Sequence, residues 1–187
     1  IHKSIAEMAS LRGQDPIDAF LDVALDDPGL TILTANGGDP EATGEILRSP
    51  YILIGESDAG AHVQFDANFG YATVLLATWV RDKRLMSLEQ AIHKLTFQVA
   101  SIYGIQGRGL IRPGCAADLT IFDPDTVAPC EPEWAEDYPA NTRRMVQRST
   151  GLDYTIVNGR VIYDHGALSG DLPGQVIRGQ AATRAGN

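Results

Sequence analysis

The most informative part of the sequence is Tyr51-Ile52-Leu53-Ile54-Gly55-Glu56-Ser57-Asp58-Ala59-Gly60-Ala61-His62. Its first part, 51–55, is almost purely apolar, which is typical of a strand covered on both faces in a parallel sheet. A polar, glycine-containing loop follows at once and runs to about residue 68. In barrels and doubly wound sheets, catalytic groups lie at the carboxyl ends of the strands. The stretch therefore predicts a buried parallel strand with a candidate site in the loop after it.

Helices are predicted on both sides of this strand. Asp15-Pro16 and Asp39-Pro40 each place an acidic N-cap before a proline, which favours a helix start. A short β-prone run at 30–34 lies between them. Helical spacing of apolar residues over 71–83 and a capping box at Ser87-Leu88-Glu89-Gln90 predict two more helices, the second reaching about residue 102. This alternation indicates parallel βα units, so we expect an α/β fold.

The composition changes after Gly104, where glycine and proline become frequent and apolar runs become short. Residues 117–122 predict a strand, in which Asp118 is expected to satisfy backbone donors at the strand start. Residues 154–163 predict a hairpin, because Asn158-Gly159 is the dipeptide of a type I′ turn. Residues 125–148 are Pro-rich and polar and allow no assignment. A small β-structure is therefore expected to follow the α/β part.

Composition excludes several classes of function. The chain has 187 residues, 44% of them hydrophobic, which is enough for a globular core. A formal net charge of −9 argues against a nucleic-acid partner, which requires a basic face. Neither an apolar run of about 18 residues nor a signal peptide is visible, so we expect no membrane association and a cytoplasmic location. Cys115 and Cys130 lack metal or redox spacing, and a start inside a helix at Ile1 suggests a piece of a longer protein.

A series of motifs resembles, in the same order, the end of an N-acyl-D-amino-acid deacylase, a family of the amidohydrolase superfamily. They are Ser57-Asp58-Ala59-Gly60-Ala61-His62 and residues 71–82, 87–91, 107–114, 116–123 and 157–159. The resemblance implies a (β/α)8 metal-dependent hydrolase barrel and a small β-sandwich built from both chain termini. Residues 1–108 would then be the last βα units of a partial TIM barrel, and 109–187 the C-terminal portion of the β-sandwich.

The resemblance also implies a site. The family's strand-eight aspartate falls on Asp58, which would bind zinc and act as general base and then acid in hydrolysing the amide of a small N-acylated D-amino acid. An aspartate in a small-residue loop is, by itself, more often a turn former. His62, four residues on, would face the substrate or orient Asp58, or else is a surface histidine. Residues 68–71 depart from the polar and aromatic set of some family members, which leaves the acyl and side-chain specificity open.

The remaining metal ligands are expected upstream of Ile1. The chain has only four histidines, His2, His62, His93 and His165, without metal-ligand spacing, and zinc needs three or more protein ligands. We therefore expect the isolated chain to be inactive. His93 is expected to be structural.

Two alternatives remain open: a hydrolase of cyclic amides such as hydantoin or dihydroorotate, and a non-catalytic interaction module that keeps the fold. The cluster Arg143, Arg144 and Arg148 could bind a carboxylate but is better explained as a solvated loop. Because a half-barrel exposes strand edges and an apolar face, we expect self-association or pairing with the missing N-terminal half.

Overall fold

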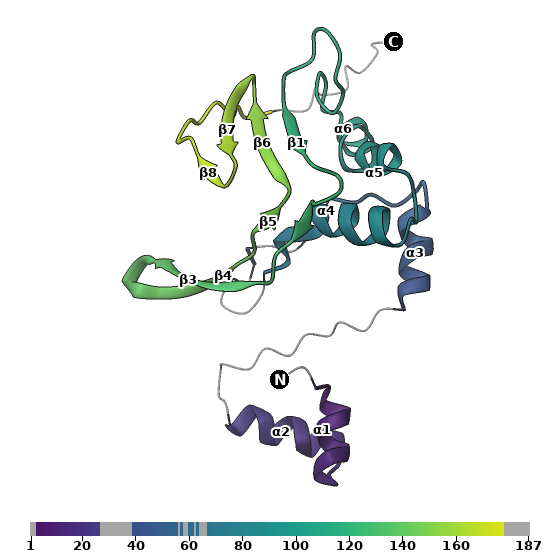
Figure 1. The fold of residues 1–187 in the computed structure, drawn as a ribbon, viewed down its shortest axis with the longest axis vertical. Helices are drawn as coiled ribbons and strands as arrows, with labels where there is room; N and C mark the ends of the chain where they lie inside the picture. The colour runs from purple at the N-terminus through teal and green to yellow at the C-terminus, as the bar shows by residue number, and fades with distance from the viewer. Residues whose placement is uncertain are drawn as a thin grey trace, which may run out of the picture. The chain divides into compact units, whose positions relative to one another are not determined.

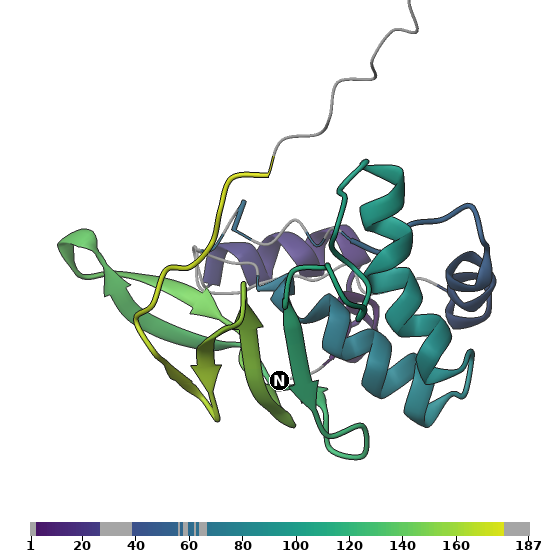
Figure 2. The ribbon, with the colours of Figure 1, turned by 90° about the horizontal axis from the view of Figure 1, so that it is seen from above.

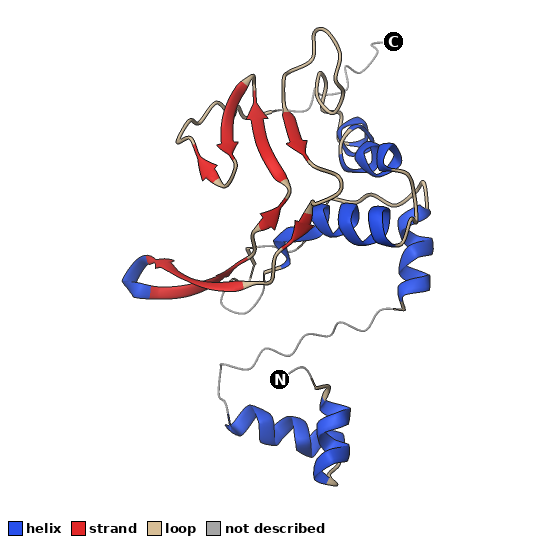
Figure 3. Ribbon diagram, viewed as in Figure 1, coloured by secondary structure: helices blue, strands red, loops and turns tan. Residues whose placement is uncertain are grey.

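The computed structural model describes residues 3–26, 39–55, 57, 60–61, 63 and 67–177. The chain forms two compact units, Ile1–Gly38 and Asp39–Asn187. The described part of the first is helical, whereas the second combines helices with antiparallel strands (Figures 1 and 3). The mixed α/β class predicted from the sequence is confirmed. The predicted boundary between residues 108 and 109 lies within the second unit and stays a prediction.

The described part of the first unit is a pair of helices, α1 (Ile5–Arg12) and α2 (Pro16–Asp26). A capping box starts α1, since the Ser4 hydroxyl accepts from Glu7 N and the Glu7 carboxylate accepts from Ser4 N. The predicted cap of α2 is also present, because Asp15 Oδ1 accepts from Ile17 N at 2.8 Å. Large apolar side chains remain exposed on both helices: Leu11, Ile17, Phe20, Leu21 and Leu25.

Helical segments come first among the described residues of the second unit. They are α3 (Pro40–Arg48), η1 (Asn68–Gly70), α4 (Tyr71–Val74), η2 (Leu75–Asp82), α5 (Leu88–Leu95) and α6 (Phe97–Ile102). The predicted helix over 71–83 is confirmed, but its second part, η2, is wound as a π-helix. The predicted helix over 87–102 starts at the capping box of Ser87 and is interrupted at Thr96, whose φ of −123° and ψ of −86° are not helical.

A four-stranded antiparallel sheet follows, with strand order β1-β6-β7-β8. Its strands are β1 (Leu119–Phe122), β6 (Leu152–Val157), β7 (Arg160–Asp164) and β8 (Ala167–Leu168). The turn between β6 and β7 has positive φ at both Asn158 (47°) and Gly159 (77°), which confirms the predicted type I′ hairpin. Asp118 accepts a hydrogen bond from Asn158 N at 2.8 Å and forms an ion pair with Arg108, so its predicted role as a backbone acceptor is confirmed.

Two small ribbons occupy the region that the sequence left unassigned. β2 (Ala128–Pro129) pairs with β5 (Ser149–Thr150), and β3 (Glu133–Tyr138) pairs with β4 (Thr142–Val146) through η3 (Pro139–Asn141). Within the second unit, the β3–β4 hairpin extends away from α5 and α6 (Figure 2). The predicted loop is wrong for Arg143 and Arg144, which lie in β4, but Arg148 follows the strand and its side chain is 73% exposed, as predicted for a solvated group. Arg144 pairs with Asp137 and Arg148 with Glu133, each at 2.7 Å.

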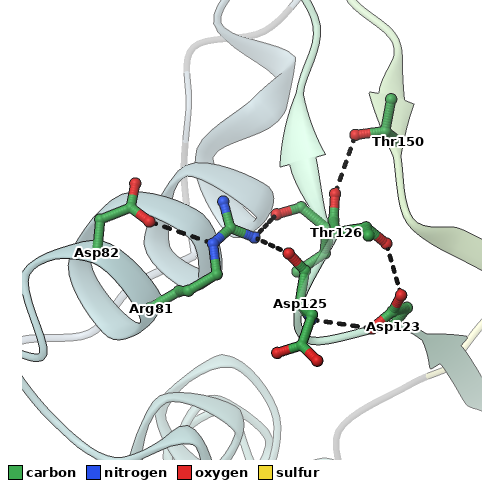
Figure 4. Close-up of polar contacts among 7 residues, drawn as sticks. Arg81, Asp82, Asp123, Asp125, Thr126 and Thr150 are labelled. Atoms are coloured by element: carbon green, nitrogen blue, oxygen red, sulfur yellow. Dashed lines mark hydrogen bonds and ion pairs between the residues drawn. The ribbon is translucent and has the colours of Figure 1, made fainter.

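The core lies where η2 and α5 meet the turn between β1 and β2. It centres on Leu75, Leu76, Ala91 and Val127, each at most 6% exposed. Arg81 of η2 crosses this junction and donates from Nη1 to the carbonyl oxygens of Asp125 and Val127, at 3.3 and 2.8 Å (Figure 4). The turn itself is closed by Asp123, which accepts from Asp125 N and from the Thr126 hydroxyl. A charged side chain thus joins the helices to the strands.

The predicted strand over 51–55 is not observed. These residues pair with no other strand in the part of the chain that the structure describes, where strands occur only between Leu119 and Leu168. A strand requires a hydrogen-bonding neighbour, and the predicted strand at 30–34 lies outside the described residues. The parallel barrel arrangement therefore stays a prediction. Among the described residues, no helix is long and apolar enough to cross a membrane.

Candidate functional site

Side chains of α5 and α6 hold the backbone that leads into the predicted site. Lys94 donates from Nζ to the carbonyl oxygen of Ser49 at 2.7 Å, and Gln98 donates from Nε2 to that of Pro50 at 3.0 Å. Lys94 is only 8% exposed, and desolvation lowers its pKa from the ordinary value. These bonds give the carbonyl groups directly before 51–55 side-chain donors, so this backbone is held without strand pairing.

The two predicted site residues, Asp58 and His62, lie outside the described residues. Their assignment therefore rests on the sequence. The structure describes Ser57 immediately before Asp58 and Val63 immediately after His62. Val63 is 6% exposed, and its carbonyl oxygen accepts from Met145 N of β4 at 2.6 Å. The loop is thus anchored to the β3–β4 hairpin next to a predicted site residue.

A second anchor lies at Gly70, where the loop enters α4. Gly70 N donates to Oε1 of Gln147 at 2.8 Å, and Nε2 of Gln147 donates to the carbonyl oxygen of Cys130 at 3.1 Å. The carbonyl oxygen of Gly70 accepts from the Thr73 hydroxyl at 3.0 Å. Sequence reasoning missed Gln147, because it stands 77 residues from Gly70 in an unassigned region and belongs to no motif.

A cavity of about 540 Å³ adjoins the described start of the loop. Its polar lining comes from Ser57, Asn68 and Gln147, together with the backbone of Gly55 and Gly70. Its larger part is apolar and is formed by Leu47, Ile52, Leu53, Ile54, Tyr71, Val74, Leu75 and Trp79. An apolar concavity with a few polar groups suits a small organic ligand or a further packing element.

A cavity of about 850 Å³ lies between α3 and α5 and includes no residue of the loop. His93 lines it and packs against the ring of Phe97, with ring centroids 5.7 Å apart. The other described histidine, His165, lies in the β7–β8 turn beside Asp164. Within the described ranges, no three histidine, cysteine or carboxylate side chains are grouped so as to hold a metal. The described residues therefore do not fit a zinc site.

Comparison with known proteins gives a consistent result. The sequence profile of the "Amidohydrolase family" matches residues 2–163. An N-acyl-D-aspartate deacylase of Alcaligenes xylosoxydans xylosoxydans is 34% identical over 176 residues, which cover 88% of this chain and 33% of that protein. A dihydroorotase of Lactobacillus helveticus is 30% identical over 95 residues, which cover 50% of this chain and 22% of that protein.

Comparison with solved structures finds the same kind of protein. D-aminoacylase aligns with a TM-score of 0.57 at 24% identity, covering 90% of this chain and 33% of that chain, and one of its structures concerns a binuclear metal centre. N-acyl-D-glutamate deacylase from Bordetella bronchiseptica, complexed with zinc and a phosphonate inhibitor, aligns with a TM-score of 0.55 at 27% identity, covering 94% and 34%. The chain thus spans about a third of the length of these proteins, with 33% of the first and 34% of the second.

Proposed function

This chain belongs to the amidohydrolase family, and we propose that the full-length protein hydrolyses the amide bond of N-acyl-D-amino acids with a bound divalent metal, zinc by preference. The observation that carries the proposal is the 34% identity to an N-acyl-D-aspartate deacylase across 88% of the chain. The family match over residues 2–163 includes the loop after 51–55, where the family resemblance expects the reacting groups.

Asp58 is the residue of this chain that we assign to the reaction. Its carboxylate would accept a proton from the attacking water and return it to the leaving amine, which completes hydrolysis without a net change in the enzyme. It would also be one ligand of the metal. The other ligands would come from the remainder of the full-length protein, since the described residues hold no site for the ion.

The comparisons favour linear amides as the substrate class. The dihydroorotase similarity extends over 50% of the chain, compared with 88% for the deacylase, so a cyclic amide is the second candidate. We assign His62 to the substrate side of the site, four residues beyond Asp58. Because loop groups at the end of such strands determine substrate choice, the amino acid and acyl group must be measured directly.

The decisive experiment is a substrate panel on the full-length protein: N-acetyl-D-amino acids, their L-enantiomers, hydantoin and dihydroorotate, each with native enzyme and with Asp58→Asn. We expect turnover of a D-amide that Asp58→Asn reduces at least about a thousandfold, by analogy with loss of other catalytic groups. Turnover of a cyclic amide alone would favour the second candidate. Absence of all turnover in a zinc-loaded protein would indicate a non-catalytic module.

We also propose that 1–108 and 109–187 contribute to a barrel and a β-sandwich, respectively, and that the exposed apolar side chains of the 187-residue chain are covered by the rest of the protein or by a second copy. Tyr51 and Ile111 are each 91% exposed and Leu25 is 78% exposed. Such surfaces favour association. Light scattering of the isolated chain should therefore show dimers or larger species, whereas a monodisperse monomer would contradict this part of the proposal.

A further inference from the structure

Gln147 connects three parts of the second unit. Its amide oxygen accepts from Gly70 N at 2.8 Å, its amide nitrogen donates to the carbonyl of Cys130 at 3.1 Å, and its side chain lines the cavity beside Ser57. A half-buried amide that uses both its donor and its acceptor is held in one orientation. The side chain is therefore a fixed bridge between the strands and the end of the loop.

Gly70 is fitted closely to this bridge. A Cβ atom at position 70 would lie 2.7 Å from Oε1 of Gln147 and 3.1 Å from Cβ of Pro129. The φ of Gly70, −83°, is accessible to any residue, so glycine is needed here because of the close approach and not because of the backbone conformation. An additional methyl group at position 70 would therefore require the Gln147 side chain to move.

Strand β4 makes a second contact with the loop. Met145, two residues before Gln147, donates from its backbone N to the carbonyl of Val63 at 2.6 Å. Residues 145 and 147 thus hold the loop at Val63 and at Gly70. Both anchors come after Asp58 in the sequence.

We propose that Gln147 is a positioning residue of the active site: it fixes the backbone of Gly70 at the cavity that is lined by Gln147 and by Ser57, the residue directly before Asp58 in the sequence. This inference rests on the proposed function, since the lining of this cavity needs accurate placement only if the reaction takes place beside it. Displacement of a reacting group by about 1 Å can cost about a hundredfold in rate, so the bridge is expected to act on kcat and not on substrate affinity.

The bridge is tested first on the 187-residue chain, by amide exchange measured with NMR. In the native chain the Gly70 amide should exchange at least about tenfold more slowly than the exposed Ala61 amide. Gln147→Met, which keeps the length but removes both hydrogen bonds, should accelerate Gly70 exchange about tenfold. Gln14→Met, which removes the bond from Gln14 Nε2 to Asp22 in the other compact unit, is the matched control and should leave Gly70 unchanged.

Gly70→Ala is the second variant, and it attacks the same contact from the opposite side. Gly70→Ala should lower the free energy of unfolding more in the native chain than in a chain that already carries Gln147→Ala. The reason is that alanine at position 147 removes the atom that the added Cβ would approach to 2.7 Å. Equal destabilisation in both backgrounds, or a Gly70 amide that exchanges as fast as Ala61 in the native chain, would overturn the bridge.

The positioning role is tested on the full-length protein. Gln147→Met should lower kcat about tenfold with KM within about twofold, and Gln14→Met should alter neither. A loss confined to stability, with kcat and KM unchanged, would overturn the positioning role. A native full-length protein without amidase activity would instead defeat the proposed function, while the exchange experiment would still decide whether the bridge exists.

Discussion

Arg81 Nη1 donates to the carbonyl oxygen of Val127 at 2.8 Å, and Val127 is 1% exposed. The guanidinium group therefore satisfies an acceptor in the core junction between η2 and the turn from β1 to β2. It also bonds the carbonyl of Asp125 at 3.3 Å. A planar group with several fixed donors can reach two carbonyls at once, which an ammonium group does less well.

Replacing Arg81 by methionine should lower the free energy of unfolding by about 2 kcal/mol, because both carbonyls lose a charge-assisted donor. Arg81→Lys should recover only part of the loss. Arg160→Met is the control, since the Arg160 side chain is 69% exposed and its nearest carboxylate oxygen, on Asp171, is 3.8 Å away. Urea denaturation measures all three. A loss for Arg81→Met no larger than that for Arg160→Met would show that the junction does not depend on this side chain.

Gly151 is the second critical point of the same junction. Its φ is 69°, and an added Cβ would lie 2.4 Å from Val127 N and 2.6 Å from its Cα. Gly151→Ala should therefore destabilise the chain by about 3 kcal/mol or more, or prevent folding. Gly104→Ala separates conformation from contact, because Gly104 has a similar φ of 66° and no atom within 4 Å of the added Cβ. It should cost only about 1 kcal/mol. Similar losses for the two variants would argue against the steric explanation.

The sequence predicted those features whose causes are local. The caps at Asp15, Asp39 and Ser87 each bond a backbone N–H two or three residues away, and the Asn158-Gly159 turn needs only two residues with positive φ. These elements therefore occur where the sequence predicts them. The resemblance to the deacylases likewise depended on short motifs, and the family match confirms it.

Features with distant causes were missed. The bond from Gly70 to Gln147 joins residues that are 77 apart, and neither side chain type nor spacing indicates such a pair. The β3–β4 hairpin has an irregular pattern of exposure, with only Ala135 partly buried in β3, so it lacks the alternation by which strands are recognised. The apolar run at 51–55 has the composition of a strand, but the structure shows none there, because pairing also requires a neighbour that composition does not supply.

His165 should make stability depend on pH. The hydrogen bond from its Nδ1 to Asp164, 2.6 Å long, raises the pKa of His165 above the ordinary 6.5, and Asp153 at 3.6 Å acts in the same direction. A raised pKa in the folded state stabilises the protein below pH 6.5, and this contribution is lost as pH rises through the folded pKa.

The measurement is the difference in unfolding free energy between the native chain and His165→Asn, from about pH 5 to about pH 9. Asparagine tolerates the φ of 44° at this position, so the substitution changes mainly the titrating group. The difference should be largest at the acid end and shrink with increasing pH. It should also shrink in about 1 M salt, because the group is exposed. A difference that grows with pH would contradict the assigned partners.

Zinc content tests how the proposed metal site is divided along the chain. The described residues offer no group of three donors, and the sequence assigns one ligand, Asp58, to this chain. A single carboxylate binds zinc weakly, whereas a structural or catalytic site uses three or four protein ligands. The purified 187-residue chain should therefore contain far less than one zinc per molecule by elemental analysis, and Asp58→Ala should leave that value unchanged.

The full-length protein should bind one or two ions and lose affinity on Asp58→Ala. About one zinc per 187-residue chain, removed by Asp58→Ala, would mean that this chain forms a site by itself, and the donors would then have to include residues outside the described ranges.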